Sequence, residues 1–507
     1  MFGSFFVQRH WTLRAKIGIN SRMGQEIEHS HFQQGDFDAF MQRLREETAL
    51  LARYFAEDRF DNRPPVAGFE LEAWLVDEHM QPAPINKAFL ERLNSPLVSP
   101  ELATFNVEFN VEPAPLTGSA LSTLERELQA GWEAGCDTAH ALNADLAMIG
   151  ILPTVQNTDL VMENLSAMNR YVALNAQVLR LRGGRPLQLD IRGPGTDPDI
   201  LRAEHGDVML ESATTSFQIH LQVPPAMAVR AYNASIIGSA PLVAISANSP
   251  YLFGHDLWAE TRIPLFEQAV EVGGYEDDAH GPMRRVSFGS GYVRNSVMEC
   301  YTENLEHFPV LLPTLFDSPP EKFEHLRLHN GTLWRWNRPL IGFEADGTPH
   351  LRIEQRVASA GPTIIDSVAN AAFFYGLTQA LCERDCAPEM ELPFAIARDN
   401  FYACAQHGLD AHIVWLDGQK HQAQSLLLKV LIPLAYTGLE SLGIEHKDAA
   451  YYLGIIEARV RNACNGAAWQ RAFVATHAGK NGDTMQQLLS AYLERQHSGE
   501  PVHEWSL

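Results

Sequence analysis

Cysteine is scarce in this chain. Six of its 507 residues are cysteines, namely Cys136, Cys300, Cys382, Cys386, Cys404 and Cys464. Disulfide frameworks are typical of small secreted domains, so these sparse thiols predict reduced, structural cysteines and a cytoplasmic protein. Cys382 and Cys386 are one helical turn apart, but no second pair or nearby histidine in the sequence completes a zinc site.

Long apolar runs and an excess of basic charge are also missing. No run approaches about 18 uninterrupted apolar residues, so the sequence predicts no transmembrane helix and no membrane partner. The formal net charge of -23 argues against nucleic acid as the main partner and favours small molecules. The oligomeric state stays open, a homo-oligomer included.

Two common nucleotide-binding motifs are absent as well. The chain has neither a Walker-type Gly-x4-Gly-Lys-Ser/Thr sequence nor a Rossmann glycine fingerprint. A nucleotide would therefore have to be held through metal ions and arginines. Arg294, which lies near Gly289 and Gly291, is one predicted phosphate or substrate contact.

The chain divides into three predicted parts. Residues 1–35 form an N-terminal arm, for which disorder is one interpretation; its first 22 residues hold no acid and lack the apolar core of a signal peptide. Residues 36–412 form a catalytic domain, and residues 413–507 form a helical part packed on it. Mixed strands followed by helices indicate an α+β fold with one major sheet.

Apolar periodicity and breaker residues predict the individual elements. Helices are expected over 37–57 after an N-cap at Asp36, and over 122–145, 160–182, 226–248, 364–383 and most of 393–495. Short strands are expected at 147–152 and 187–192. Residues 273–348, rich in glycine, proline and aromatics, are expected to form active-site loops.

Four short stretches alternate polar and apolar residues. They are residues 68–74 (GFELEAW), 105–113 (FNVEFNVEP), 216–223 (SFQIHLQV) and 351–357 (LRIEQRV). Side chains alternate across a strand, so each stretch has one polar side. The polar sets are Glu70 and Glu72; Glu108, Asn110 and Glu112; Gln218, His220 and Gln222; and Arg352, Glu354 and Arg356.

If these strands share a sheet, five glutamates converge on one surface. Each close like-charge pair costs about 4 kcal/mol at ~4 Å and an effective dielectric of ~20, so a cation is expected there. Oxygen ligands favour hard cations such as Mg²⁺. The alternative is a set of half-buried strands whose polar faces meet water. Such faces normally carry lysine as well as acids, and no lysine occurs in the four stretches.

These stretches, in this order, resemble glutamate-cysteine ligase family 2, a group of carboxylate-amine ligases with a glutamine synthetase-like fold. The matching residues are 68–72, Glu108, Glu112, His220, 352–356, Pro362, Thr363, Asp366 and 407–411. The resemblance implies a central, mainly antiparallel sheet with a metal-lined face, helices on its other face and a helical C-terminal part. It spans roughly residues 66–412.

The resemblance also implies an activity in glutathione biosynthesis. Such enzymes use ATP and Mg²⁺ to form a γ-glutamyl (acyl) phosphate, and the amine of cysteine or another amino compound then displaces phosphate. By this resemblance, the ligands for two or three magnesium ions are Glu70, Glu72, Glu108, Glu112, His220 and Glu354. A satisfied core histidine is the alternative for His220.

Phosphoryl transfer is helped by positioning and by positive charge on the moving oxygens. Arg356 is the favoured catalytic arginine together with Glu354, and Arg352 is a further substrate or nucleotide contact, because both arginines share the face of Glu354. An Arg-Glu ladder across the sheet is the alternative. Further predicted contacts lie in 329–338 and are Arg335, Trp336 and Arg338; a cation-π cluster there is equally ordinary.

The chain departs from the family pattern before residues 407–410. Ala403 and Gln406 stand where relatives usually carry arginines. This departure motivates a second hypothesis, a metal- or nucleotide-binding sensor without turnover. A third is another phosphotransferase on the same metal face, such as a guanidino kinase.

From the sequence alone, Glu354 is one of several mutually repelling acids. The substitution Glu354→Gln is therefore expected to abolish activity while the melting temperature stays similar or rises.

Overall fold

The computed structural model describes residues 26–27, 29–272, 275–277, 281–477 and 483–507. The predicted N-terminal arm falls mostly on residues 1–25 and 28, which lie outside the described residues. The element order of the rest alternates short strands with helices up to residue 355 and is mostly helical afterwards.

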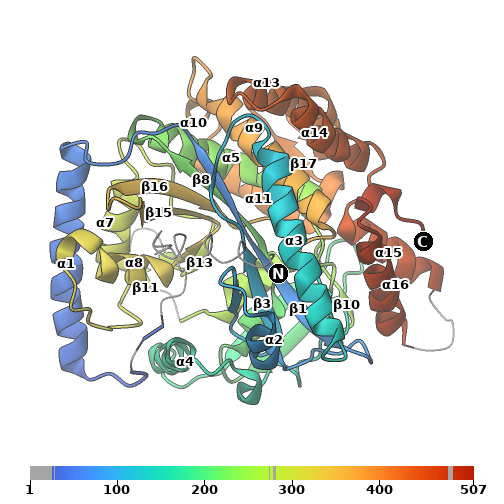
Figure 1. The fold of residues 1–507 in the computed structure, drawn as a ribbon, viewed down its shortest axis with the longest axis horizontal. Helices are drawn as coiled ribbons and strands as arrows, with labels where there is room; N and C mark the ends of the chain where they lie inside the picture. The colour runs from blue at the N-terminus through green and yellow to red at the C-terminus, as the bar shows by residue number, and fades with distance from the viewer. Residues whose placement is uncertain (1–25, 28, 273–274, 278–280, 478–482) are drawn as a thin grey trace, which may run out of the picture.

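Eight strands form one sheet at the centre of Figure 1, and all of its strand pairs are antiparallel. The order is β15-β16-β8-β1-β3-β2, with β4 and β5 also paired to the long strand β1. The strands are β15 (Asn337–Phe343), β16 (Pro349–Gln355), β8 (Phe217–Val223), β1 (Val66–Asp77), β3 (Asn106–Asn110), β2 (Val98–Pro100), β4 (Ala114–Pro115) and β5 (Ala144–Ala147).

Helices cover the apolar face of this sheet. The helices α5 (Ala228–Ser246), α9 (Ile364–Cys382) and α3 (Ala120–His140) contact it and share one core cluster with Phe69, Phe217 and Ile353. The Tyr375 hydroxyl of α9 donates to the carbonyl of His220, 3.0 Å away, which ties the helix to β8. The predicted α+β class, with a mainly antiparallel sheet and helices on its apolar face, is confirmed.

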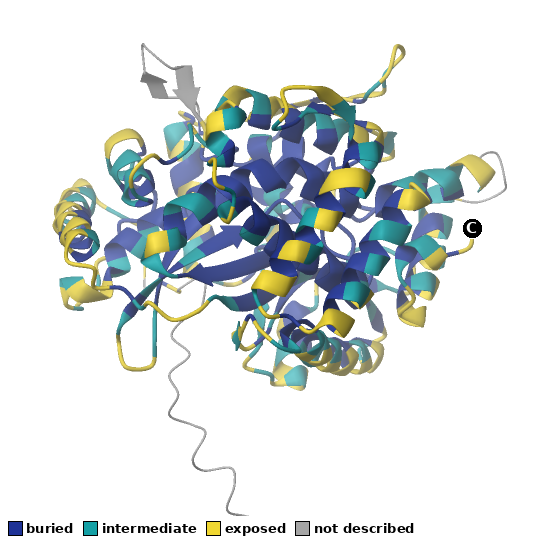
Figure 2. Ribbon diagram, turned by 90° about the horizontal axis from the view of Figure 1, so that it is seen from above, coloured by how far each residue is buried: buried dark blue, intermediate teal, exposed yellow. Residues whose placement is uncertain are grey.

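One described helix, Pro225–Ser246, is long and apolar enough to span a membrane. However, 89% of its most apolar window is buried inside the protein. Figure 2 shows such buried helices at the centre of the molecule. This segment is therefore the core helix α5, as its apolar sequence predicts.

The C-terminal helices pack mainly on α9 and α5. Here α13 (Ile432–Ser441) and α14 (His446–Arg461) contact α9, α11 (Phe394–His407) contacts α5, and α15 (Gly466–His477) contacts α16 (Thr484–Ser498). Helix α13 crosses α9 so closely that a Cβ at Gly376 would collide with the carbonyl of Ala435. The crossing therefore requires glycine.

Other helices lie on the opposite side of the sheet. At the left of Figure 1, α1 (Gln34–Ala56) packs on α7 (Met298–His307) and α8 (Glu324–Gly331), and α4 (Asn169–Leu181) lies below the sheet. The shorter elements are α2 (Asn86–Leu93), α6 (Arg262–Ala269), α10 (Pro388–Glu391), α12 (Ala423–Leu426), β6 (Leu187–Arg192), β7 (Ile200–His205), β9 (Tyr251–Leu252), β10 (His255–Asp256), β11 (Tyr275–Asp277), β12 (Gly281–Met283), β13 (Val286–Ser287), β14 (Trp334–Arg335), β17 (His412–Val414) and β18 (Lys420–Gln422).

Several predicted elements agree with the structure, among them β6, α5 and α9. Others were misplaced. The N-cap of α1 is Gln33 and not Asp36. The backbone N–H of Gln33 donates to the Asp36 carboxylate at 2.7 Å. The strand expected at 147–152 is β5, which begins at Ala144 and already ends at Ala147. The helix expected at 160–182 begins only at Asn169. The expected loops at 273–348 contain α7, α8 and β15, because tertiary packing outweighs the weak local periodicity there.

The α9-α13 crossing can be tested with Gly376→Ala. The added methyl group must push the helices apart, and overpacking of this kind costs typically about 1–3 kcal/mol, so the melting temperature should fall. Gly454→Ala in α14 is the matched control, since a Cβ there meets nothing within 4 Å. Alanine in a helix interior gains about 0.5–1 kcal/mol over glycine, so that variant should be as stable or more stable. An unchanged melting temperature in Gly376→Ala would contradict the close crossing.

Candidate active site

The polar face of the sheet gathers most of the charged side chains expected there. The register places Glu72 opposite Glu108, and Glu354 opposite both His220 and Arg338. Glu70 lies two residues before Glu72 on β1, on the same side of the strand, and is paired with Gln218 of β8. The predicted common face is therefore formed by β1, β3, β8, β15 and β16.

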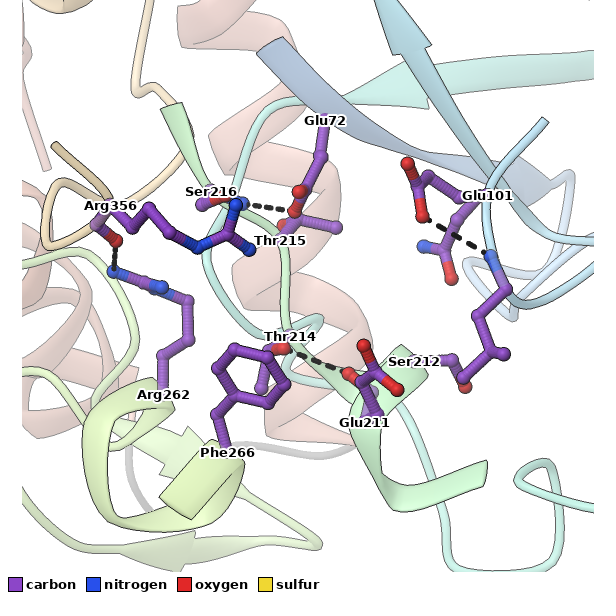
Figure 3. A pocket seen from close by; sticks show the side chains of 12 residues that line it. Glu72, Glu101, Glu211, Ser212, Thr214, Thr215, Ser216, Arg262, Phe266 and Arg356 are labelled. Atoms are coloured by element: carbon purple, nitrogen blue, oxygen red, sulfur yellow. Dashed lines mark hydrogen bonds between the residues drawn. The ribbon is translucent and has the colours of Figure 1, made fainter. Parts of the chain in front are cut away.

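Two adjoining cavities open on this face, with volumes of about 250 Å³ and 40 Å³. The larger lies between the sheet and residues of α4, α7 and α8. Both cavities are lined by Glu72, Glu101, Glu211 and Arg356, and Figure 3 shows these four side chains around the smaller one. The charged side chains are thus placed where a ligand can reach them.

The first cluster is Glu70, His220 and Glu354, whose ligand atoms lie within 4.8 Å of one another. Glu70 lines the larger cavity, and His220 and Glu354 lie behind it, outside the lining of both cavities. All three side chains are buried. His220 Nε2 lies 2.9 Å from Glu70 Oε1, while Glu70 Oε2 is buried without a hydrogen-bond partner among the described residues. The cluster therefore has a buried carboxylate oxygen without a hydrogen bond among the described residues.

Two arginines fix Glu354 within the first cluster. The Arg338 guanidinium donates to both of its oxygens, at 2.7 and 3.1 Å, and Arg356 Nη1 lies 3.3 Å from Oε2. Burial would raise the pKa of Glu354, but Arg338, Arg356 and His220 outweigh it and lower the pKa to about 2. Glu354 is consequently ionised at neutral pH.

The second cluster is Glu72, Glu101 and Glu108, again within 4.8 Å. Glu72 accepts from the backbone N–H of Ser216 at 2.6 Å and from Gln218 Nε2 at 2.9 Å. Glu108 Oε1 accepts from Asn110 Nδ2 at 2.9 Å. These bonds hold two of the three carboxylates in fixed orientations.

Burial and mutual repulsion act strongly on the second cluster. Burial, with the charge of Glu101, raises the pKa of Glu72 to about 7. The pKa of Glu108 rises well above its usual value through burial, Glu70 and Glu101, and burial raises the pKa of nearby Glu211 to about 8. In the metal-free protein several of these carboxyls therefore keep protons near neutral pH, and a cation would displace them.

The donor sets of the two clusters fit hard divalent cations. The first offers the imidazole of His220 and the unpaired oxygen of Glu70, while Glu354 would share with the ion oxygens that Arg338 and Arg356 already contact. The second offers three carboxylates. Magnesium prefers such oxygen-rich sites and keeps further positions for water and phosphate.

Arginines line the other part of the larger cavity. These are Arg170, Arg327, Arg338, Arg352 and Arg356. Burial and the neighbouring charge of Arg352 lower the pKa of Arg327, and Arg352 Nε is buried without a hydrogen-bond partner in the described chain. An anionic group bound between Arg327 and Arg352 would offset the repulsion between their charges and accept a hydrogen bond from Arg352 Nε.

Some predicted site residues lie elsewhere. Glu112 is exposed, because β3 ends at Asn110 and the alternation ends with it; its backbone N–H donates to Glu127 Oε1. Arg294 is exposed and outside both cavities, and its backbone N–H is bound by Glu299. The expectation that these two side chains join the cleft is wrong.

Arg335 and Trp336 are buried away from the cleft, and neither lines the two cavities. Arg335 Nη1 donates to Asn304 Oδ1 at 2.6 Å. Trp336 Nε1 donates to Glu267 Oε1 at 2.9 Å, and its ring packs against Phe266. Both side chains thus have structural partners, and their cation-π contacts are with residues outside 329–338: Arg335 lies over Phe308, and Arg262 lies over Trp336.

Sequence reasoning also missed residues that line the cleft. Glu101 follows the short strand β2, Glu211 lies in a 3₁₀ turn, and Arg170 and Arg327 are on helices. None belongs to an alternating stretch. Asn106 is different: it lies two residues before Glu108, on the same side of the strand, so the alternating pattern could have identified it. Its side-chain amide has no hydrogen-bond partner among the described residues.

Comparison with known proteins identifies the family to which the chain belongs. Residues 66–490 match the family model of glutamate-cysteine ligase family 2 (GCS2). The chain belongs to this family. Its members are ligases that form C–N bonds, and the assignment supports an ATP-dependent carboxylate-amine ligase. No curated protein matches the sequence.

Solved structures resemble this family member in fold. A glutamate-cysteine ligase from Francisella tularensis, in complex with AMP, aligns with a TM-score of 0.51 and 10% identity over 87% of this chain and 90% of that one. A bifunctional glutathione synthetase from Pasteurella multocida aligns with a TM-score of 0.50 and 12% identity over 85% of this chain and 52% of that one. At these identities the likeness shows the fold alone.

The ion pairs of Glu354 reverse the stability expected for Glu354→Gln. Removing this charge leaves Arg338 and Arg356 buried without their counter-charge, which costs about 3–5 kcal/mol when a buried pair is broken. We expect a clear fall in the melting temperature in metal-free buffer, with amide hydrogen bonds recovering part of the loss.

Glu108→Gln is the matched variant. Because burial and repulsion already favour its neutral form, its melting temperature should stay the same or rise. Thermal unfolding of both variants at pH 7.5 measures the contrast. Equal shifts in the two variants would contradict these opposite electrostatic environments.

Proposed function

We propose that this ligase uses ATP and Mg²⁺ to convert the γ-carboxylate of glutamate, or of a similar substrate, into an acyl phosphate. The amine of cysteine or another amino compound then displaces phosphate and forms an amide. Family membership supports the reaction class, and the AMP complex of the Francisella tularensis neighbour supports a nucleotide as co-substrate. The names of both neighbours favour a role in glutathione biosynthesis.

The observation that carries the proposal is the pair of three-ligand clusters on one sheet face, next to a group of arginines. Divalent ions held by Glu70, His220, Glu354, Glu72, Glu101 and Glu108 would neutralise the triphosphate and align its γ-phosphoryl group. Fixed strands carry five of these six ligands, so the orientation is pre-set.

Arg356 is the proposed catalytic arginine. Its guanidinium is held by Glu354 and by the side-chain oxygen of Gln218, and it lines both cavities. From there its planar N–H fork can stabilise the negative charge on the transferred phosphoryl group. Burial would lower its pKa, but the Glu354 and Glu72 carboxylates outweigh this and raise it, so the charge is permanent.

The substrate carboxylate has a binding position on the basic side. Arg327 and Arg352 lie together in the larger cavity, and each lacks full charge compensation there. An α-carboxylate bound to them would leave the side-chain carboxylate free to reach the metal clusters. Arg352 thereby keeps its predicted role as a substrate contact.

The acceptor amine fits the smaller cavity. Glu211 Oε2 and the Asn106 amide are buried there without hydrogen-bond partners among the described residues, and Figure 3 shows Glu211 across the cavity from Arg356. A carboxylate and an amide oxygen suit an ammonium group. Because burial raises the pKa of Glu211 to about 8, its carboxyl would ionise as the ammonium group binds, and it can then take the proton that the ammonium must lose before the free amine attacks.

The sensor hypothesis rested on Ala403 and Gln406. Both lie on α11 and line neither cavity, and the Gln406 carbonyl accepts from the backbone N–H of Ala259. The charged side chains that line the cleft are thus supplied by other residues, which favours turnover.

Substrate dependence of ATP consumption tests the reaction. Release of ADP and phosphate in equal amounts should require glutamate and an amine together. ATP binding without amine-stimulated hydrolysis over a broad panel of amines would favour a sensor, and ADP release without phosphate release would favour a kinase.

The metal face is tested by two glutamine substitutions four residues apart. Glu108→Gln should lower kcat/KM by at least about 100-fold, the upper range for weakened metal sites. Glu112→Gln, at an exposed position, should leave activity within about twofold. Equal activity in the two variants would remove Glu108 from the site.

The amine position predicts a selective defect in Glu211→Gln. Loss of a charged hydrogen bond of about 1.5–3 kcal/mol should raise the KM for the amine roughly 10- to 100-fold. The first turnover of ADP with glutamate alone should be unchanged, because it precedes amine attack. Quenched-flow measurement of that turnover separates the two steps, and an equal loss in both would place Glu211 elsewhere in the mechanism.

A further inference from the structure

A third group of side chains that could hold a metal ion lies outside the cleft, on the outer surface. His140 is the last residue of α3, Asp145 lies in β5, and His497 is in the last turn of α16. Their ligand atoms all lie within 4.8 Å of one another. His497 follows Asp145 by 352 positions in the sequence, so the fold brings the three residues together.

The spacing within this surface cluster suits a tetrahedral ion. Zinc binds imidazole nitrogen and carboxylate oxygen at about 2.0–2.2 Å, which places neighbouring ligand atoms of a tetrahedron about 3.3–3.6 Å apart. Asp145 Oδ1 lies 3.1 Å from His497 Nε2 and 3.6 Å from His140 Nε2. Both imidazole rings thus direct their Nε2 atoms at Asp145 Oδ1. The longer distance, from His140 Nε2, leaves His140 without a hydrogen bond to this oxygen.

The side chains are held by a rigid framework. Gln496, the residue before His497, is buried; its Nε2 donates to the Leu146 carbonyl at 2.8 Å and its Oε1 accepts from the Met148 backbone N–H at 2.7 Å. The Leu146 backbone N–H donates to Asp145 Oδ1 at 2.8 Å. Helix α16 is therefore fixed against β5 beside the cluster, so metal binding needs little rearrangement.

The electrostatic surroundings also favour a cation. His140 and His497 lie in the C-terminal turns of two different helices. The C-terminus of a helix carries a partial negative charge, and here two such ends meet at an aspartate. All three side chains keep solvent access, which leaves room for water as a fourth ligand.

We propose that His140, Asp145 and His497 form a binding site for a borderline divalent cation such as Zn²⁺, which joins α16 to α3 and β5. Two imidazoles and one carboxylate with an open position are a common zinc donor set. The site is separate from the carboxylate-rich cleft, whose oxygen donors suit Mg²⁺, and it stands independently of the ligase reaction.

Calorimetric titration of the full chain with Zn²⁺ tests this site. The protein is first freed of metal by chelation and then kept at pH 7.5 in excess Mg²⁺, so that the cleft is already occupied. The natural chain should bind one equivalent of Zn²⁺, and its melting temperature should rise with Zn²⁺. His140→Ala and His497→Ala, on different helices, should each weaken that equivalent more than about 100-fold, beyond the loss from an outer-sphere partner.

His421→Ala is the matched control. His421 is a partly exposed histidine that pairs with a single carboxylate, Asp417, at 2.9 Å. Its removal should leave Zn²⁺ binding unchanged. Absence of the equivalent in the natural chain, or equal binding in all three variants, would overturn the proposal and leave a surface His-Asp pair.

Discussion

Repulsion among buried carboxylates constrains this protein more than any other interaction. Four glutamates of the two clusters, Glu70, Glu72, Glu101 and Glu108, approach one another on one sheet face with Glu211 nearby. The metal-free protein tolerates them in two ways. Carboxyls of the second cluster bind protons more readily than free glutamate, and Glu354, whose pKa is lowered, lies between arginines. Divalent cations would take over from the protons when the enzyme works, which couples metal uptake to proton release.

The opposite face of the same sheet fixes this arrangement. Phe69, Phe217 and Ile353 point into the core against α5 and α9, so a slip of one residue would turn a glutamate or histidine into that core. Strong burial on one side thus determines the register on the other. The apolar core therefore positions the backbone of the charged residues, and hydrogen bonds and the ion pairs of Glu354 orient their side chains.

The period-two pattern predicted much of this fold and site, and its failures have clear causes. It found Glu70, Glu72, Glu108, His220 and Glu354 because all five lie within regular strands. It failed at Glu112, where β3 has already ended. It could not find Glu101 or Glu211, because residues outside regular strands and helices show no periodic pattern in the sequence. It could not find Arg170 and Arg327 either, because they lie on helices that only tertiary packing brings to the cleft. The stability expected for Glu354→Gln changes for a related reason: composition shows the acids, but only the register shows that Arg338 stands opposite Glu354.

Crystals soaked with Mn²⁺ and a non-hydrolysable ATP analogue would test the central claim most directly. Anomalous scattering should reveal manganese between Glu70, His220 and Glu354, and between Glu72, Glu101 and Glu108, with triphosphate oxygens completing the coordination. Triphosphate bound elsewhere, or no anomalous peak at either cluster, would contradict the account.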